Sequence, residues 1–450
     1  MTSPDFDELL NIYVRFLPEA VTSYMQKQAG MRRHRGIYAV IVVFWLMMVQ
    51  RLKANASLAS CVQELTQGRM NALLPDCKRV REQRISPRTG ALCRARQKLP
   101  VKLARDVGRE MFARIEEQLR EALPAVKAPV LLLDGSSVQL EHCPVLLKRY
   151  PAGSNQHGAA HWPVIRMVVM HDLSTGLAHH PCWGPMYGPE AVSEQELGVQ
   201  SLAQVSAETV VMADRNFGVF SIAWAAHERG QPMVLRLTET RARRLRGKPF
   251  THQGAWPVTW QPSREERRNQ KNQRWPEDAA ISGTLIAWRV GRGKSKTWLY
   301  LFTTVSAPPE ELVELYGRRW NIETDLRSLK QTVHLNHITA RSVEMVEKEL
   351  LMAIAAYNLV RAVMALAARR ARLDPRQLSF THVLYAVQAA WPDLTHASDP
   401  RLREQAFQRV LDTAARCRLP NRARHRSYPR AQWSRGERYP ARKAPDGKSK

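Results

Sequence analysis

Residues 306–333 read SAPPEELVELYGRRWNIETDLRSLKQTV, and the rest of the chain is organised around this stretch. A capping residue type, Ser306, precedes two prolines suited to a first helical turn, and apolar residues then recur at helical spacing. Because a helix turns by about 100° per residue, four polar side chains form one file along the border of the apolar face: Tyr316, Arg319, Glu323 and Lys330. The same wheel predicts that three others face solvent: Arg318, Asp325 and Ser328.

Two aspartates follow short apolar runs elsewhere in the chain. The run APVLLL (128–133) leads to Asp134, and the run TVVMA (209–213) leads to Asp214. Short apolar runs bounded by turn-forming residues predict buried strands. We therefore predict that each aspartate ends a strand, which is where α/β folds place catalytic groups, although aspartates that merely cap turns are common.

The helix spacing Tyr-x2-Arg-x3-Glu-x6-Lys, together with Asp134-Gly-Ser and Asp214-Arg-Asn-Phe-Gly, resembles the signature of insertion-sequence family four. These proteins are bacterial DDE transposases with a ribonuclease-H-like core, and the resemblance extends over about residues 86–365. It implies three catalytic and metal-ligating carboxylates: Asp134, Asp214 and Glu323. One departure is Asn216, which stands where the family usually has glycine and which puts the local turn in question.

The resemblance also implies ligands and partners. Two Mg²⁺ ions, for which Mn²⁺ substitutes, would bind the carboxylates, since hard cations prefer oxygen ligands. Phosphates beside the cut would be bound by three residues of the polar file: Tyr316, Arg319 and Lys330. Trp298 and Trp320 stand where the family places aromatic residues that hold a flipped base, with a core role about equally expected. The expected partner is double-stranded DNA, both terminal inverted repeats and target, held by a homodimer in the synaptic complex.

Changes in the pattern of apolar, polar and basic residues along the chain predict an α/β protein with five parts. A helical DNA-binding domain (1–120) precedes the first part of a ribonuclease-H-like catalytic core (121–238). A β-rich insertion (239–305) separates it from the second part of the core (306–370). C-terminal helices and a basic tail (371–450) follow, and residues 401–450 are expected to be poorly ordered.

The net charge and the length of the apolar runs indicate which class of partner the protein binds. A net charge of +27 and a pI near 10.4 indicate a polyanionic partner, with nucleic acid ahead of a membrane surface. A basic run suited to phosphate contacts lies in the N-terminal part: Arg79, Arg81, Arg84, Arg88, Arg94, Arg96 and Lys98. The longest apolar run, residues 37–49, is shorter than the roughly 20 residues that a membrane span needs, so we expect no membrane association.

The six cysteines form no Cys-x2-Cys pair, which argues against a zinc site and fits a reduced, cytoplasmic, nucleoid-associated bacterial protein.

Two other functions stay open. One is a metal-dependent nuclease or resolvase on the same core, which would keep the three carboxylates without needing the polar file. The other is an inactive, domesticated DNA-binding protein, which would be expected to have lost a carboxylate.

Overall fold

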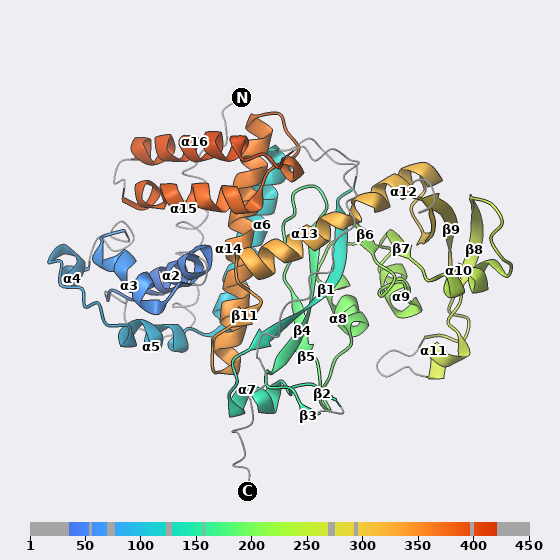
Figure 1. Ribbon diagram of the computed structural model, residues 1–450, viewed down its shortest axis with the longest axis horizontal. Helices are drawn as coiled ribbons and strands as arrows, with labels where there is room; N and C mark the ends of the chain where they lie inside the picture. The colour runs from blue at the N-terminus through green and yellow to red at the C-terminus, as the bar shows by residue number, and fades with distance from the viewer. Residues whose placement is uncertain are drawn as a thin grey trace, which may run out of the picture. The chain divides into compact units, whose positions relative to one another are not determined.

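A mixed β-sheet built around one long strand, β1 (Val130–Leu140), organises the computed structural model (Figure 1). On one side β1 pairs antiparallel with β4 (Val164–Asp172), which pairs antiparallel with β5 (Cys182–Pro185). On its other side β1 pairs parallel with β6 (Val210–Ala213), which pairs parallel with β7 (Met233–Arg236). The predicted α/β class is therefore confirmed.

The structure describes residues 36–53, 56–69, 77–122, 128–155, 158–268, 275–291, 296–396 and 400–420. Beyond β7 the same sheet continues antiparallel through the strands of the predicted insertion: β10 (Thr297–Thr303), β9 (Ile281–Val290) and β8 (Gly254–Trp260). The insertion thus extends the sheet instead of standing apart from it. Two short helices flank β8: α10 (Glu239–Arg246) and α11 (Arg264–Arg268).

The prediction that β1 ends at Asp134 is wrong. The strand runs on through Asp134 to Leu140, because β4 pairs with it over its whole length. Only the parallel partner stops early: β6 pairs with β1 as far as Leu133 and Ala213. A short strand, β11 (His337–Ile338), pairs with the far end of β1 at Gln139 and Leu140. Between these two partners one edge of β1 pairs with no other described strand.

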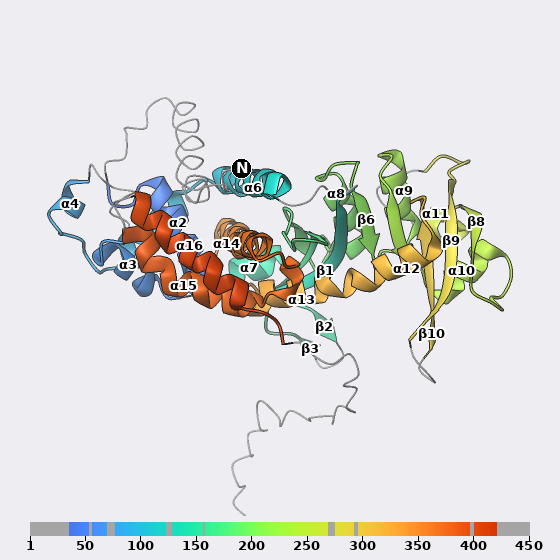
Figure 2. The same cartoon turned by 90° about the horizontal axis from the view of Figure 1, so that it is seen from above.

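The two faces of the sheet carry different helices, as Figure 2 shows. Side chains alternate along β1, so Leu131 and Leu133 pack towards α8 (Glu194–Leu202) and α9 (Phe220–Glu228). The intervening Leu132 packs on the opposite face with residues of α12 (Pro309–Gly317) and α13 (Asn321–Arg327). The helix predicted at 306–333 therefore covers the second face.

That helix is broken in two places. A 3₁₀ turn, η3 (Arg318–Trp320), separates α12 from α13, and a π-helical turn, η4 (Ser328–Thr332), follows α13. The prediction that Asp325 faces solvent is wrong, because its side chain is 0% exposed. The single helical wheel assumed one open face, whereas α13 lies between the sheet and the long helix α14 (Val343–Arg370).

The N-terminal helices share one apolar core with α14. They are, in order, α2 (Val40–Leu52), α3 (Leu58–Thr66), α4 (Lys78–Arg81), α5 (Gly90–Lys98) and α6 (Val101–Ala122). Glu349 of α14 is buried and accepts hydrogen bonds from Arg51 at 2.7 Å and Arg96 at 2.6 Å. Arg96, predicted to contact phosphate, instead joins α5 to α14.

Helix α14 is long and apolar enough to span a membrane by length and composition, but 94% of its most apolar window is buried inside this protein. Two further helices pack on it: α15 (Phe380–His396) and α16 (Pro400–Arg416). Residues 400–416 were expected in a poorly ordered tail and are helical, because apolar residues such as Phe407 and Val410 reach the core. Residues 421–450 of that predicted tail lie outside the described residues.

The remaining described elements are short. They are α7 (Pro144–Arg149), β2 (Ser154–Asn155), β3 (Gly158–Ala159) and the 3₁₀ turn η5 (Pro375–Gln377).

Candidate active site

The pairing of β1 with β6 brings Asp134 and Asp214 together. Leu133 and Ala213 are the last register partners of these parallel strands, so each aspartate is the next residue at the point where the strands separate. By alternation along each strand, both side chains project to the face of Leu132 and Met212, which α12 and α13 cover. The charge of Asp214 raises the pKa of Asp134, which also indicates proximity.

Arg319 joins the third predicted carboxylate to this pair. Its Nη1 lies 3.9 Å from Asp134 Oδ2, and its Nη2 lies 3.4 Å from Glu323 Oε1. The two carboxylates contact one planar guanidinium, which limits their separation to about 10 Å. Tyr316 is buried beside them, with the Arg319 guanidinium carbon 5.9 Å from its ring centroid. Three members of the predicted polar file therefore converge on the two aspartates.

The electrostatics of the site centre on Asp134. Burial raises its pKa to about 6, and the charges of Asp214 and Glu194 act in the same direction. A hydrogen bond of 2.8 Å from the Gly135 amide and the charge of Arg319 oppose this rise. Burial likewise raises the pKa of Tyr316 to about 12, so its hydroxyl keeps its proton at neutral pH. The charge of Arg236 also acts on the pKa of Tyr316, so a second arginine borders the site.

This donor set suits a divalent cation. Carboxylate oxygens are the ligands that hard divalent ions prefer, and Asp134, Asp214 and Glu323 supply them from two strands and one helix. Within the described ranges, no three His, Cys, Asp or Glu side chains are yet close enough together to hold a metal ion. Arg319 lies between Asp134 and Glu323 instead, so a bound cation would compete with its guanidinium for the two carboxylates.

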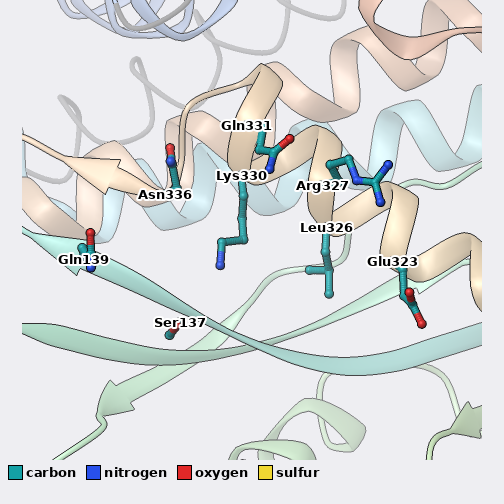
Figure 3. A pocket seen from close by; sticks show the side chains of 8 residues that line it. All are labelled: Ser137, Gln139, Glu323, Leu326, Arg327, Lys330, Gln331 and Asn336. Carbon is teal, nitrogen blue, oxygen red and sulfur yellow. The ribbon is translucent and has the colours of Figure 1, made fainter. Parts of the chain in front are cut away.

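A groove of about 440 Å³ leads away from Glu323 along the edge of β1 that lacks a partner strand (Figure 3). It is lined by Ser137, Gln139, Glu323, Leu326, Arg327, Lys330, Gln331 and Asn336. Figure 3 shows Lys330 pointing from the π-helical turn towards β1, with Glu323 at one end of the groove. Burial lowers the pKa of Lys330, and Glu323 is the only carboxylate in the lining.

The two predicted aromatic residues do not come together. Trp320 in η3 is 64% exposed and precedes Glu323 by three residues. Trp298 in β10 alternates with Leu299, so its ring lies on the other face, stacked on Tyr300 and covered by the Arg289 guanidinium at 4.8 Å. Trp288, the cross-strand partner of Leu299, lies on the face of α12.

Sequence reasoning missed Glu194 and the role of Asn216. Glu194 begins α8 after the Ser193 cap, and its charge acts on Asp134. Asn216 donates a side-chain hydrogen bond to Glu194 and accepts one from Gln195 at 3.2 Å. Among the described non-glycine residues with positive φ, Asn216 does not appear, so the turn after Asp214 needs no glycine there. The capping-box pattern at 193–196 signals the helix start but not its contact with the site.

Comparison with known proteins places these residues in a family. Residues 126–359 match the family of the transposase DDE domain. A curated relative, the transposase InsG for insertion sequence element IS4 of Escherichia coli (strain K12), is 26% identical over 365 residues, covering 78% of this chain and 77% of the relative. A solved structure, the piggyBac transposase synaptic complex with hairpin DNA, aligns at 11% identity and a TM-score of 0.40 over 86% of this chain and 77% of that one.

Proposed function

This chain belongs to the transposases with a DDE domain, and on that premise we propose that Asp134, Asp214 and Glu323 are its catalytic carboxylates. The family predicted from the sequence is confirmed: the protein is a DDE transposase of the IS4 type, an enzyme of DNA cleavage and strand transfer. The observation that carries the assignment is the strand register that ends at Leu133 and Ala213, which sets both aspartates under the helix of Glu323.

Enzymes with this domain depend on divalent metal ions, and we infer that Mg²⁺ is the ion here and that two are used. Bound at the carboxylates, such ions neutralise charge on the leaving oxygen and activate the attacking water. A bound cation would favour the ionised form of Asp134, whose pKa is raised first by burial and then by the charges of Asp214 and Glu194. Binding of a cation would free Arg319 to turn from Asp134 and Glu323 towards a phosphate.

The polar file supplies the DNA contacts. Arg319 has the planar, forked donors that match a phosphate, and its contacts to the carboxylates, at 3.4 and 3.9 Å, are long enough to exchange. Lys330 offers a point charge in the groove along β1. Tyr316 keeps its hydroxyl protonated as a hydrogen-bond donor. We assign the groove to the DNA strand that runs on from the scissile phosphate.

Of the two tryptophans, Trp320 is the one we propose for stacking on a base, since its side chain is exposed and it lies three residues before Glu323. Trp298 packs within the insertion on the other face of the sheet and takes no part in this contact. Trp288 lies on the face of α12 and is the aromatic residue of the insertion that we assign to the DNA side. Stacking on an exposed aromatic ring contributes about 1–3 kcal/mol per base.

The strand order β5-β4-β1-β6-β7, in which only β4 runs antiparallel to β1, supports a ribonuclease-H-like core at 121–238 and 306–370. We propose that the helical part at 1–120 binds the terminal inverted repeats of the element and that the tail within 371–450 adds non-specific DNA affinity. Cut-and-paste transposition requires two ends to be paired, so a homodimer is the expected synaptic form. Nucleoid association follows from the +27 net charge.

The test is a cleavage assay on supercoiled DNA that carries the terminal sequences flanking the gene. Asp134→Asn, Asp214→Asn and Glu323→Gln should each reduce nicking by on the order of 1,000-fold while DNA binding persists. Arg319→Ala and Lys330→Ala should reduce both strand transfer and cleavage. A metal-dependent nuclease would still cleave without transferring strands, and a domesticated DNA-binding protein would not cleave even as the parent chain.

A further inference from the structure

A buried carboxylate lies directly behind the predicted catalytic one. Asp325 is two residues after Glu323 on α13, so the two side chains leave the helix about 200° apart. Glu323 is 37% exposed and faces Arg319, whereas Asp325 is 0% exposed and faces α14 and η5. The back of the catalytic helix therefore carries a charge that water does not reach.

Two arginines hold this carboxylate. Arg361 of α14 and Arg376 of η5 both donate to Asp325 Oδ1, the latter at 2.6 Å. Arg361 also donates from Nε to the Tyr357 hydroxyl at 2.8 Å. We refer to Asp325, Arg361, Arg376 and Tyr357 as the Asp325 cluster.

The cluster also grips the turn that ends β4. Arg376 donates to the carbonyl oxygens of Asp172 at 2.8 Å and Leu173 at 2.9 Å, and Tyr357 donates to that of Gly176 at 2.9 Å. Gly176 has a φ of +79°, and a Cβ there would lie 2.9 Å from both guanidiniums. The turn is shaped to admit the two arginines.

These contacts link the helix of Glu323 to the strand of Asp134. Strand β4 pairs with β1 in an unbroken register that includes Asp172 with Leu131 and Val169 with Asp134. A continuous set of hydrogen bonds thus runs from α13 through Arg376 to β4 and then to β1. On the front of α13, the same two elements are joined by apolar packing around Leu132 and by the two long contacts of Arg319 in η3.

We propose that the Asp325 cluster is the device that sets the distance of Glu323 from Asp134 and Asp214, with Asp325, Arg361 and Arg376 as positioning residues. The inference rests on the proposed catalytic role of the three carboxylates. Apolar contacts alone allow a helix to slide or rotate, whereas two arginines that donate to one carboxylate oxygen fix where that oxygen lies. Buried ionic groups add little net stability, so their value here is the arrangement that they impose.

The chain offers a matched control. Glu349 is buried on α14, the helix that also carries Arg361. It too is held by two arginines, Arg51 and Arg96, but it faces the N-terminal helices. We would compare Asp325→Leu/Arg361→Met/Arg376→Met with Glu349→Leu/Arg51→Met/Arg96→Met. Each set replaces one carboxylate and two guanidiniums by apolar side chains, a change that often leaves stability unaltered or improved.

The Asp325 set should bind DNA as the parent does, yet cleave about 10- to 100-fold more slowly, the usual cost of losing groups that orient metal ligands. Its DNA-free form should also bind Mn²⁺ more weakly by a similar factor, measured by electron paramagnetic resonance. The Glu349 set should leave the Mn²⁺ affinity of the DNA-free form within about twofold of the parent. Its cleavage does not enter the comparison, since Arg51 and Arg96 lie in the helical part assigned to the inverted repeats. If the Asp325 set fails to fold, Arg376→Gln, which keeps the Arg361–Asp325 pair, should show the same two losses on a smaller scale.

Parental Mn²⁺ affinity and cleavage in the Asp325 set would overturn the positioning role. Equal losses of Mn²⁺ affinity in both sets would overturn it too. Failure of the proposed function is recognised separately. In that case Glu323→Gln itself would leave cleavage and Mn²⁺ binding of the otherwise unaltered chain unchanged.

Discussion

The two sides of helix α13 are built on opposite principles. At the front, Glu323 is partly exposed and has one long contact, 3.4 Å from Arg319. At the back, Asp325 is fully buried and shared by two arginines, one of them at 2.6 Å. Seven residues of one helix therefore carry one weakly held and one strongly held carboxylate.

The difference shows how a site can be both precise and available. A carboxylate that must accept a cation gains nothing from a strong prior partner, since the cation would have to displace it. Its position must then be fixed from elsewhere, and the rigid back of the same helix can do so. Charge is left unbalanced at the front, where Asp134 has a raised pKa, and is overbalanced by arginines at the back, where the pKa of Asp325 is lowered despite burial.

The largest contrast should appear in stability. Asp325→Ala leaves two buried guanidiniums without their carboxylate, and we expect a loss of about 3–5 kcal/mol in the free energy of unfolding. Glu323→Ala on the same helix removes one long, partly exposed ion pair and should cost no more than about 1 kcal/mol. Urea unfolding without divalent ions measures both. Similar costs for the two variants would show that front and back do not differ as described.

The pH dependence should also have opposite signs on the two sides. Burial and neighbouring carboxylates raise the pKa of Asp134 from 3.8 to about 6. Ionised Asp134 therefore destabilises the folded state at neutral pH, by roughly 3 kcal/mol, and this cost disappears as the pH falls from about 6 towards 3.8. At Asp325, burial acts to raise the pKa but the two arginines outweigh it, so its contribution is present at neutral pH and is lost only below 3.8.

Asp134→Asn separates these effects. The variant should be more stable than the parent at pH 7, and its advantage should shrink steadily between pH 7 and pH 4. Urea unfolding at four pH values in metal-free buffer gives the comparison. A constant difference across the range would mean that Asp134 does not titrate there.

The sequence predicted the front of the helix and failed at the back. Tyr316, Arg319 and Glu323 share a face because their spacing keeps to one α-helical period across η3, and the structure brings them to the two aspartates. The helical wheel also predicted that Asp325 faces solvent. A single sequence shows which side chains share a helix face but not which other elements pack against that face. The partners of Asp325 lie 36 and 51 residues further along the chain.

Other errors have equally specific causes. The strand of Asp134 was ended too early because Gly135 and two serines look like a turn, while pairing with β4 keeps them extended. That Trp298 lies on the face away from α12 could not be predicted, because the face of each side chain depends on the register of β9 and β10. Arg96 belonged to a basic run by sequence, yet it turns inward to a glutamate 253 residues away.

Two glycine positions can test how rigidly the Asp325 cluster is packed. Gly176 has a φ of +79° and guanidinium atoms 2.9 Å from the position of an added Cβ, whereas Gly230 has a φ of +64° with open space around it. Gly230→Ala should cost about 1 kcal/mol, the strain of a left-handed alanine. Gly176→Ala should cost about 2 kcal/mol or more, since the arginines must also shift. Equal losses in thermal unfolding would indicate that the cluster yields easily and cannot fix α13.

The smallest effect is expected at Asn216, in the turn after Asp214. Its side chain forms hydrogen bonds with Glu194 and Gln195, and its backbone amide donates to Asp214 Oδ1 at 2.8 Å. Asn216→Gly keeps the amide but loses the side-chain bonds, so the free energy of unfolding should fall by about 1 kcal/mol. Gln195→Ala removes two neutral hydrogen bonds to Asn216 but keeps the bond to the charged Glu194, so it should cost less. A gain in stability for Asn216→Gly would mean that the turn after Asp214 is strained by asparagine, and the front of the site would then be held more tightly than its long contacts indicate.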